Sequence, residues 1–349
     1  MDFNAFSYVP IIGVRPSEMQ ALEELPPHVK IGILPFVVLQ PWTTAKEFPS
    51  TLAKVVASTA GKPTIVDITD ENFAGARRPV HDVFDQLRNS EGGYAAWRRF
   101  IEENEAFIPA IQLSDPNSIV PQLHAFKSMG RGVVIRLHEQ IFALAGNIAQ
   151  IFKYYPYNSD VYFILDFQRQ DKNILNKALI ATNTCKSIRD HLPDCFVSVS
   201  ASTFPMSFTD IIEQEIFERR FYTLVGEQIG YDHHIYCDRA SVRAEKQNGG
   251  GGSPAPRIDN ALSTKWKFFR EAEEEDRDEA YQIAARRATK CPEWIDLGIW
   301  GTEMIKRTVA GEENAIYSPK MSTSARINIH MYMQAGAPES AAEIEWTDL

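Results

Sequence analysis

An apolar run that ends at a carboxylate is the first feature of this sequence that could carry chemistry. Residues 161–165 are all apolar, and Asp166 follows them directly. A strand without a polar face is typical of a parallel sheet that helices cover on both sides. Arg136 lies in a similar run, 132–139, and beside Asp166 it would keep the carboxylate ionised and present a charged pair to a ligand. The alternative is an ion pair that only supports the neighbouring loops.

Polar side chains stand at corresponding places along the rest of the chain. If the strands are parallel, their carboxyl ends meet on one face, where barrel enzymes place their functional groups. We therefore predict Asp166, Arg136 and Asp238 as candidate catalytic residues. The candidate ligand-binding residues are Arg15, Asp67, His138, Gln168, Ser200, Arg239, Asn328 and His330.

A divalent cation is a further possibility at this face. Asp67, Asp70 and Glu71 could bind such a cation together with Asp166, because hard cations prefer oxygen ligands. The simpler interpretation of this acidic stretch is a solvated loop. The sequence contains no G-x-S-x-G, Walker A or H-E-x-x-H motif, so it predicts no particular catalytic machinery.

Eight strand-like runs, each followed by a helical segment or a turn, would position these residues. The pattern predicts an α/β fold, a (β/α)8 TIM-like barrel, with an open doubly wound sheet as the alternative. No G-x-G-x-x-G follows the first run, which argues against a dinucleotide-binding open sheet. The runs are residues 8–13, 32–42, 63–68, 107–113, 132–139, 160–171, 195–203 and 233–241.

The chain changes character after the eighth run. We predict a barrel core over 1–244, a flexible Gly/Pro-rich excursion over 245–260, and a closing helix with accessory strands over 261–349. In 326–333, "RINIHMYM", apolar and polar residues alternate as in a half-buried strand. We expect this strand to pair within a small accessory layer, with Arg326 and its polar neighbours along the ligand surface. Packing against the outer wall is the alternative.

The composition indicates an ordinary globular protein. The chain has 349 residues, 44% of them hydrophobic, and a formal net charge of −10, which argues against direct nucleic-acid binding. No apolar stretch reaches the roughly 20 residues that a membrane span needs. The N-terminus has no secretory signal, and the four scattered cysteines form no C-x-x-C pair. We expect a reduced, cytoplasmic protein.

Short motifs along most of the chain resemble the beta protein family of phages and bacteria. The opening "YVPIIGVRPSEMQALEEL" with "ILPFVVL" resembles the start of that family, as do Asp166, Phe204–Pro205, Asp238 and "RINIH" further on. Two places depart from the family pattern: the second strand ends in Gln40 instead of an acid, and Cys237–Asp238–Arg239 replaces Gly-Asp-Tyr. The resemblance implies a barrel-like fold and a phage or anti-phage context, without an established reaction.

Two functions follow as hypotheses. The first is a binding barrel in phage–host conflict that recognises an anionic small molecule or a protein partner at its C-terminal face. The second is a metal-assisted phosphodiester or nucleotide hydrolase that uses Asp67, Asp166 and Asp238. Carboxylates that converge on one point would favour the hydrolase. Carboxylates paired with arginines, under a C-terminal segment that covers the face, would favour binding.

Overall fold

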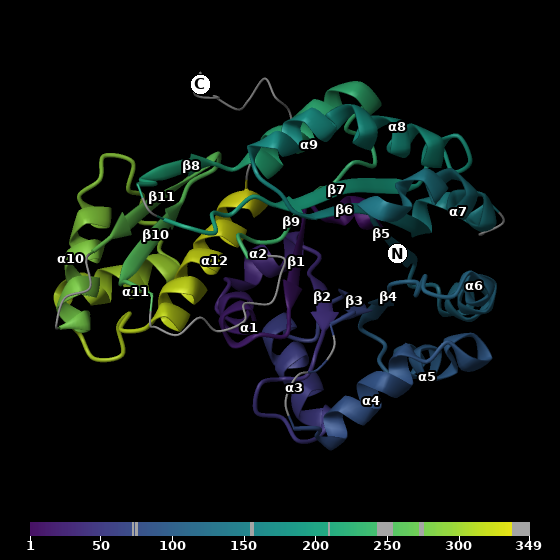
Figure 1. Ribbon diagram of the computed structural model, residues 1–349, viewed down its shortest axis with the longest axis horizontal. Coiled ribbons are helices and arrows are strands. Elements are labelled where there is room, and N and C mark those ends of the chain that lie inside the picture. The colour runs from purple at the N-terminus through teal and green to yellow at the C-terminus, as the bar shows by residue number, and fades with distance from the viewer. Residues whose placement is uncertain are drawn as a thin grey trace.

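Parallel strands that alternate with helices make up the larger part of the molecule (Figure 1). The computed structural model describes residues 1–71, 73, 76–153, 157–208, 210–242, 254–271 and 276–336. The parallel strands are β1 (Tyr8–Gly13), β2 (Phe36–Leu39), β3 (Thr64–Ile68), β4 (Phe107–Pro109), β5 (Val133–His138), β6 (Val161–Arg169), β7 (Phe196–Ser202) and β9 (Tyr236–Asp238).

Helices follow the strands in nearly every interval. A proline lies in the first turn of α1, α3 and α4, where its missing N–H costs nothing. Gly130 ends α6 in the left-handed conformation that helix ends favour. The helices are α1 (Pro16–Glu23), α2 (Pro27–Gly32), α3 (Phe48–Thr59), α4 (Pro79–Arg88), α5 (Glu91–Glu102), α6 (Ile119–Met129), α7 (Ala145–Phe152), α8 (Ala178–Arg189) and α9 (Phe217–Ile229), with short 3-10 helices at Phe3–Ala5, Pro116–Ser118, Glu139–Leu144, Asn158–Asp160 and Lys172–Lys177.

The parallel strands form two sheets. One has the order β4-β3-β2-β1-β9 and the other the order β5-β6-β7. Single parallel bridges, Ala110 to Val134 and Val197 to His234, join the sheets at both of their edges. The predicted α/β fold with parallel strands is therefore confirmed, whereas the strand pairing of the described residues does not form the continuous closed ladder of the predicted barrel.

One apolar cluster lies on the side of the strands that faces away from the helices. Each of the eight parallel strands, or the residue directly next to it, contributes a buried side chain. A second, larger cluster lies between the strands and the surrounding helices. Both faces of the strands are thus buried, which explains why their sequences are apolar without alternation.

A small accessory layer lies beside the parallel strands, at the left of Figure 1. It is an antiparallel sheet of order β10-β11-β8, covered by helices. The strand β8 lies inside the stretch 1–244 that the sequence assigns to the barrel core, between the seventh and eighth predicted runs. The elements are β8 (Glu213–Glu215), β10 (Arg257–Ala261), β11 (Lys265–Arg270), α10 (Arg277–Thr289), α11 (Trp300–Ala310) and α12 (Pro319–Ala335).

The prediction of a strand over 326–333 is wrong, because these residues belong to the helix α12. This helix lies between the two parts of the molecule. Ile327 and Met331 join the core of the parallel strands, whereas Ala325 and Ile329 join the core of the accessory layer. Two residues turn a helix by about 200°, so a helix buried on opposite sides shows the alternation that usually indicates a strand.

The predicted excursion over 245–260 ends earlier than expected. The strand β10 begins at Arg257, and Asp259 and Asn260 are buried in it. Residues 243–253, which carry the glycine run, lie outside the described residues. The predicted accessory layer therefore begins directly after Pro256.

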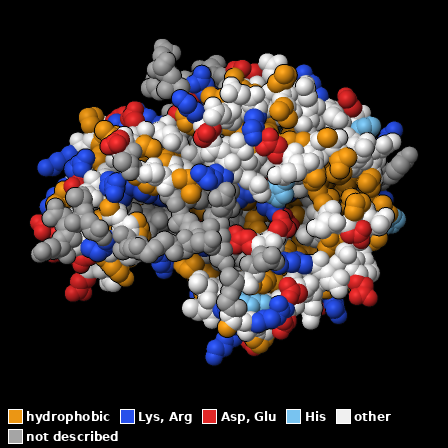
Figure 2. Space-filling model, in the orientation of Figure 1, with side chains coloured by type: hydrophobic (Ala, Val, Ile, Leu, Met, Phe, Trp, Pro, Cys, Tyr) orange, Lys and Arg blue, Asp and Glu red, His pale blue; other side chains and the backbone are white. Residues whose placement is uncertain are grey.

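The surface carries charges of both signs. Figure 2 shows hydrophobic side chains gathered over α7, and charged side chains distributed over much of the remaining face. The large exposed hydrophobic residues include Leu144, directly before α7, and Leu179 and Ile180 in α8. Within the part of the chain that the structure describes, no helix is sufficiently long and apolar to cross a membrane.

Candidate ligand-binding site at the carboxyl ends of the parallel strands

The carboxyl ends of β3, β5 and β6 bring charged side chains together. Arg136 Nη2 lies 2.7 Å from Asp67 Oδ2, and Arg136 Nη1 lies 3.7 Å from Asp166 Oδ2. Arg239, which follows β9, donates from Nε to Asp166 Oδ1 over 3.3 Å. Parallel strands end at a common edge, so residues 30 or more apart along the chain meet here. We call this cluster the mouth and define it as Asp67, Arg136, His138, Asp166, Gln168 and Arg239.

The two arginines keep Asp166 ionised. The carboxylate is fully buried, and burial alone would raise its pKa. Arg239 and Arg136 outweigh that effect, so the pKa of Asp166 lies below its usual range. Burial would lower the pKa of Arg136, but the carboxylates of Asp67 and Asp166 outweigh burial and raise it. The predicted contact between Arg136 and Asp166 therefore exists, and Arg239 and Asp67 belong to the same network.

His138 lies next to this network without joining it by a hydrogen bond. Burial and the nearby Arg136 lower the pKa of His138, so the ring is neutral at pH 7. Its Nδ1 atom lies 3.8 Å from Asp166 Oδ2, too far for a hydrogen bond. Among the described residues, this buried nitrogen has no hydrogen-bond partner. The ring as a whole is 24% exposed and lines a small cavity over the mouth.

A break in strand pairing directs Gln168 toward the mouth. The register of β6 with β7 shifts between Asp166 and Arg169, and Gln168 has a positive φ of 57°. Such bulges and strained backbones concentrate at functional sites. Ser200 lies opposite Asp166 on β7 and is buried.

Asp238 does not reach the mouth and belongs to a separate buried cluster. Its carboxylate accepts hydrogen bonds from Tyr236 over 2.8 Å and from Tyr8. His330 Nε2 lies 2.7 Å from the same carboxylate, and Trp266 Nε1 donates to His330 Nδ1 over 3.2 Å. An indole N–H is only a donor, so His330 Nδ1 accepts this bond and Nε2 donates to Asp238. Burial would raise the pKa of Asp238, but its interactions with His330 and Tyr8 lower it on balance.

The two polar residues of α12 predicted to line the ligand surface are buried. His330 lies in the Asp238 cluster, and Asn328 accepts from Gly301 N over 3.0 Å and donates to Ala21 O over 2.9 Å. Both predictions assumed a strand with one solvated face, which the helix does not have. The third polar residue predicted to line the ligand surface, Arg326, does line a cavity.

The carboxylates proposed for a metal do not converge. Asp67 is bound by Arg136 and by Gln112, whose Nε2 donates over 2.8 Å, while Asp166 and Asp238 have the partners described above. Among the described residues, no group of three or more His, Cys, Asp or Glu side chains could hold a metal ion.

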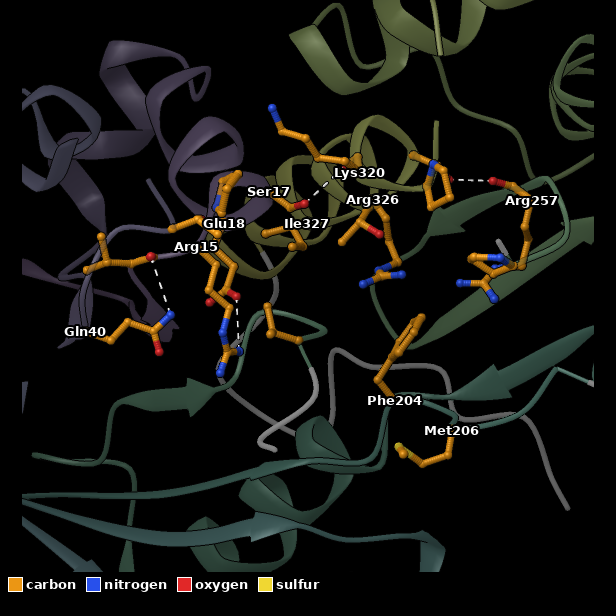
Figure 3. A pocket seen from close by; sticks show the side chains of 18 of the residues that line it. Arg15, Ser17, Glu18, Gln40, Phe204, Met206, Arg257, Lys320, Arg326 and Ile327 are labelled. Atoms are coloured by element: carbon orange, nitrogen blue, oxygen red, sulfur yellow. Dashed lines mark hydrogen bonds and ion pairs between the residues drawn. The ribbon is translucent and has the colours of Figure 1, made fainter. Parts of the chain in front are cut away.

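A cavity of about 860 Å³ opens between the mouth and the accessory layer (Figure 3). We call it the vestibule. One wall comes from the loops that follow β1, β2 and β3, including Arg15 and Gln40. The opposite wall comes from the loop after β7, with Phe204 and Met206, and from the accessory layer, with Arg257. Its size is that of a small-molecule site.

The vestibule is rich in positive charge. Among the described residues, two carboxylates line it, Glu18 and Glu71, and both contact Arg15, over 3.3 Å and 3.5 Å. Burial raises the pKa of Glu18, although Arg15 opposes the effect. Six cationic residues line the same cavity: Arg15, Arg78, Arg257, Arg270, Lys320 and Arg326.

Sequence patterns miss several of these residues. Glu18 could have been found, because it lies in the first turn after a strand-end arginine. Arg257 and Arg270 pair directly across the β10–β11 hairpin, but this register depends on a strand that begins inside the predicted excursion. Phe208 and Lys320 come from a loop and a helix start that carry no pattern of their own.

Comparison with known proteins now places the chain. The Beta protein family model matches residues 8–336. The chain belongs to the Beta protein family. It is similar to Protein beta of Enterobacteria phage P4. The two sequences are 25% identical over an alignment of 349 residues, which covers 97% of this chain and 95% of that relative. No solved structure matches the chain. The predicted family resemblance is therefore confirmed, and the vestibule lies in a member of this family.

Proposed function

We propose that the chain is a binding protein that takes an anionic ligand into the vestibule. The observation that carries this proposal is the excess of cations in a cavity of a protein whose net charge is −10. Arg257 and Arg270 lie directly opposite each other on neighbouring strands, an arrangement of like charges that destabilises a sheet unless something compensates it. Asp259 compensates part of this charge through Arg257, with an Nη2–Oδ2 distance of 2.9 Å. A bound anion would compensate the remainder.

A closed (β/α)8 barrel beneath the vestibule is part of the same proposal. The bridges at both edges of the two parallel sheets and the shared inner core support closure. In a closed barrel, the loops around the vestibule belong to the face on which such folds bind their ligands. The pairing of Asp67 and Asp166 with arginines, and of Asp238 with His330, favours binding over the alternative of a metal-assisted hydrolase.

We further propose that this binding serves phage–host conflict in the bacterial cytoplasm. Membership of a family with a relative in phage P4 supports the phage context. The four free cysteines support a reducing compartment. Phage plating on bacteria that carry the wild-type chain or a vestibule variant tests this context, and equal plating in the presence and absence of the wild-type chain would contradict it.

Titration of the purified chain with phosphate, pyrophosphate and triphosphate tests the binding proposal. We expect calorimetry to detect triphosphate binding that weakens as salt is added. The double variant Arg257→Gln with Arg270→Gln should bind about tenfold more weakly or worse, because it loses charge-assisted hydrogen bonds. Lys127→Gln with Lys186→Gln removes the same charge from the exposed outer helices α6 and α8, and should bind like the wild type. An equal loss in both double variants would contradict a specific site.

A further inference from the structure

The vestibule has a smaller neighbouring cavity, and the two differ in character. A smaller space of about 130 Å³ lies over the mouth. Arg15, Glu18, Gln40 and Glu71 line both spaces, so the two cavities adjoin each other at these side chains. In Figure 3, Arg15, Glu18 and Gln40 lie across the cavity from Arg257 and Arg326.

The two compartments differ in charge. Six cations and two carboxylates line the vestibule. Three cations and three carboxylates line the space over the mouth: Arg15, Arg136, Arg239, Glu18, Asp70 and Glu71. An anionic group therefore gains from the vestibule and gains nothing from the mouth, where a neutral group costs less to desolvate.

The mouth is suited to a flat group with hydrogen-bonding edges. Val38, which is half-buried, provides apolar surface against which such a group can pack. The His138 side chain, which is 24% exposed, lines this cavity, and Gln168, whose backbone N–H binds Asp166, exposes its side-chain amide to it. An amide offers both a donor and an acceptor, and a neutral imidazole offers one of each.

We infer that the ligand is a nucleotide, with its phosphates in the vestibule and its base over the mouth. This inference rests on the proposed binding function and specifies its ligand class. A base is planar and neutral, carries donors and acceptors on its edge, and is joined to the phosphates by a sugar. Neither inorganic polyphosphate nor a sugar phosphate combines these properties. The sugar would lie where the two cavities adjoin, beside Arg15, Glu18 and Gln40.

Calorimetric titration of the full chain with matched probes tests the inference. The probes are the four common nucleoside triphosphates, the corresponding nucleosides, ribose 5-phosphate, inorganic triphosphate, and short 5′-phosphorylated single strands. At least one nucleoside triphosphate should bind about tenfold more tightly than inorganic triphosphate, as one or two hydrogen bonds and base packing would provide. The nucleosides alone should bind weakly.

Two mouth variants separate the compartments. His138→Phe keeps a ring and removes both nitrogens, and Gln168→Gly removes the amide at a positive φ that glycine adopts without strain. Both should lower nucleotide affinity toward that of inorganic triphosphate and leave the affinity for inorganic triphosphate unchanged. We expect the melting temperature of Gln168→Gly to equal that of the wild type, and this measurement would show that the variant still folds.

The outcomes distinguish the inference from the function on which it rests. Equal affinity for inorganic triphosphate and every nucleotide would overturn the nucleotide assignment and leave anion binding intact. Preference for the single strands over every free nucleotide would also overturn it. If none of the anions binds at low salt, the proposed function and the inference both fail.

Discussion

At the residue scale, the mouth contains carboxylates whose charges are already neutralised. Asp166 is fully buried and contacts both Arg136 and Arg239. A carboxylate with two arginine partners cannot readily act as a base or hold a metal without losing one of them. We therefore consider Asp166 a residue that orients two arginines, and we expect the ligand to contact His138, Gln168 and Arg15 instead.

Asp166→Asn should destabilise the chain strongly. The variant leaves two largely buried guanidinium groups without their shared carboxylate, and breaking such a pair costs about 3–5 kcal/mol. Thermal melting should show a clear drop in melting temperature. Asp70→Asn is the matched control at the same face, because the Asp70 side chain is 81% exposed and its loss should change the melting temperature little. An Asp166→Asn variant as stable as the wild type would indicate that Asp166 is not a supporting residue.

Glu218 gives a prediction for pH. Burial raises the pKa of this glutamate to about 7, although both of its oxygens bind Thr203, through the backbone N–H and the hydroxyl. The pKa of Glu218 is higher in the folded chain than the value of about 4.5 in the unfolded chain. Its contribution to stability is therefore fully present below pH 4.5 and is lost as the pH rises through 7.

Glu218→Gln should therefore raise stability at pH 8 and leave it nearly unchanged at pH 4.5. The glutamine amide keeps both contacts with Thr203 and carries no charge, so we expect a gain of roughly 1–3 kcal/mol at pH 8. Denaturant unfolding at several pH values measures the difference. A variant that is less stable than the wild type at every pH would contradict a charged, buried Glu218.

At the element scale, α12 connects the parallel strands to the accessory layer. Gln334 Oε1 accepts from Arg219 Nε over 3.0 Å, while His330 joins α12 to Asp238 of β9 and to Trp266 of β11. The helix approaches α11 closely at Gly301, whose backbone N–H binds Asn328. The orientation of the accessory wall of the vestibule depends on these contacts.

Gly301→Ala should disrupt the contact between α11 and α12. An added Cβ would lie 2.7 Å from Ile329 Cγ1 and 2.8 Å from Ala325 O, closer than atoms can approach without a shift of the backbone. Overpacking of this kind costs about 1–3 kcal/mol, which thermal or denaturant unfolding can measure. Gly32→Ala is the control, because nothing lies within 4 Å of its added Cβ. Equal stability of the two variants would show that the helices do not pack as described.

At the scale of the whole molecule, the vestibule exists only where two parts meet. The loops of the parallel strands form one wall, and residues far along the chain form the other. The two parts share α12, whose opposite faces belong to different cores. Neither part alone would form the cavity, so the vestibule depends on the attachment of the accessory layer.

A chain that ends at residue 244 should not fold cooperatively. It lacks Ile327 and Met331, which are buried in the core of the parallel strands, and it leaves Asp238 without His330. Circular dichroism during thermal unfolding should show no sharp transition. A truncated chain with a cooperative transition and unchanged triphosphate affinity would contradict both the role of α12 and the placement of the vestibule.

The sequence by itself determined the succession of parallel strands and helices along the chain, the contact between Arg136 and Asp166, and the family. These features depend on short-range patterns: apolar runs bury both faces of parallel strands, and parallel strands end at one edge. Only the tertiary structure decided that 326–333 is helical, that Asp238 belongs to a buried histidine cluster, and that arginines from a hairpin line a cavity. Alternation along 326–333 arises because two cores cover opposite sides of one helix, and no local pattern distinguishes that from a strand with one buried face. The vestibule likewise depends on contacts between residues that lie up to about 300 positions apart, such as Ser17 and Lys320.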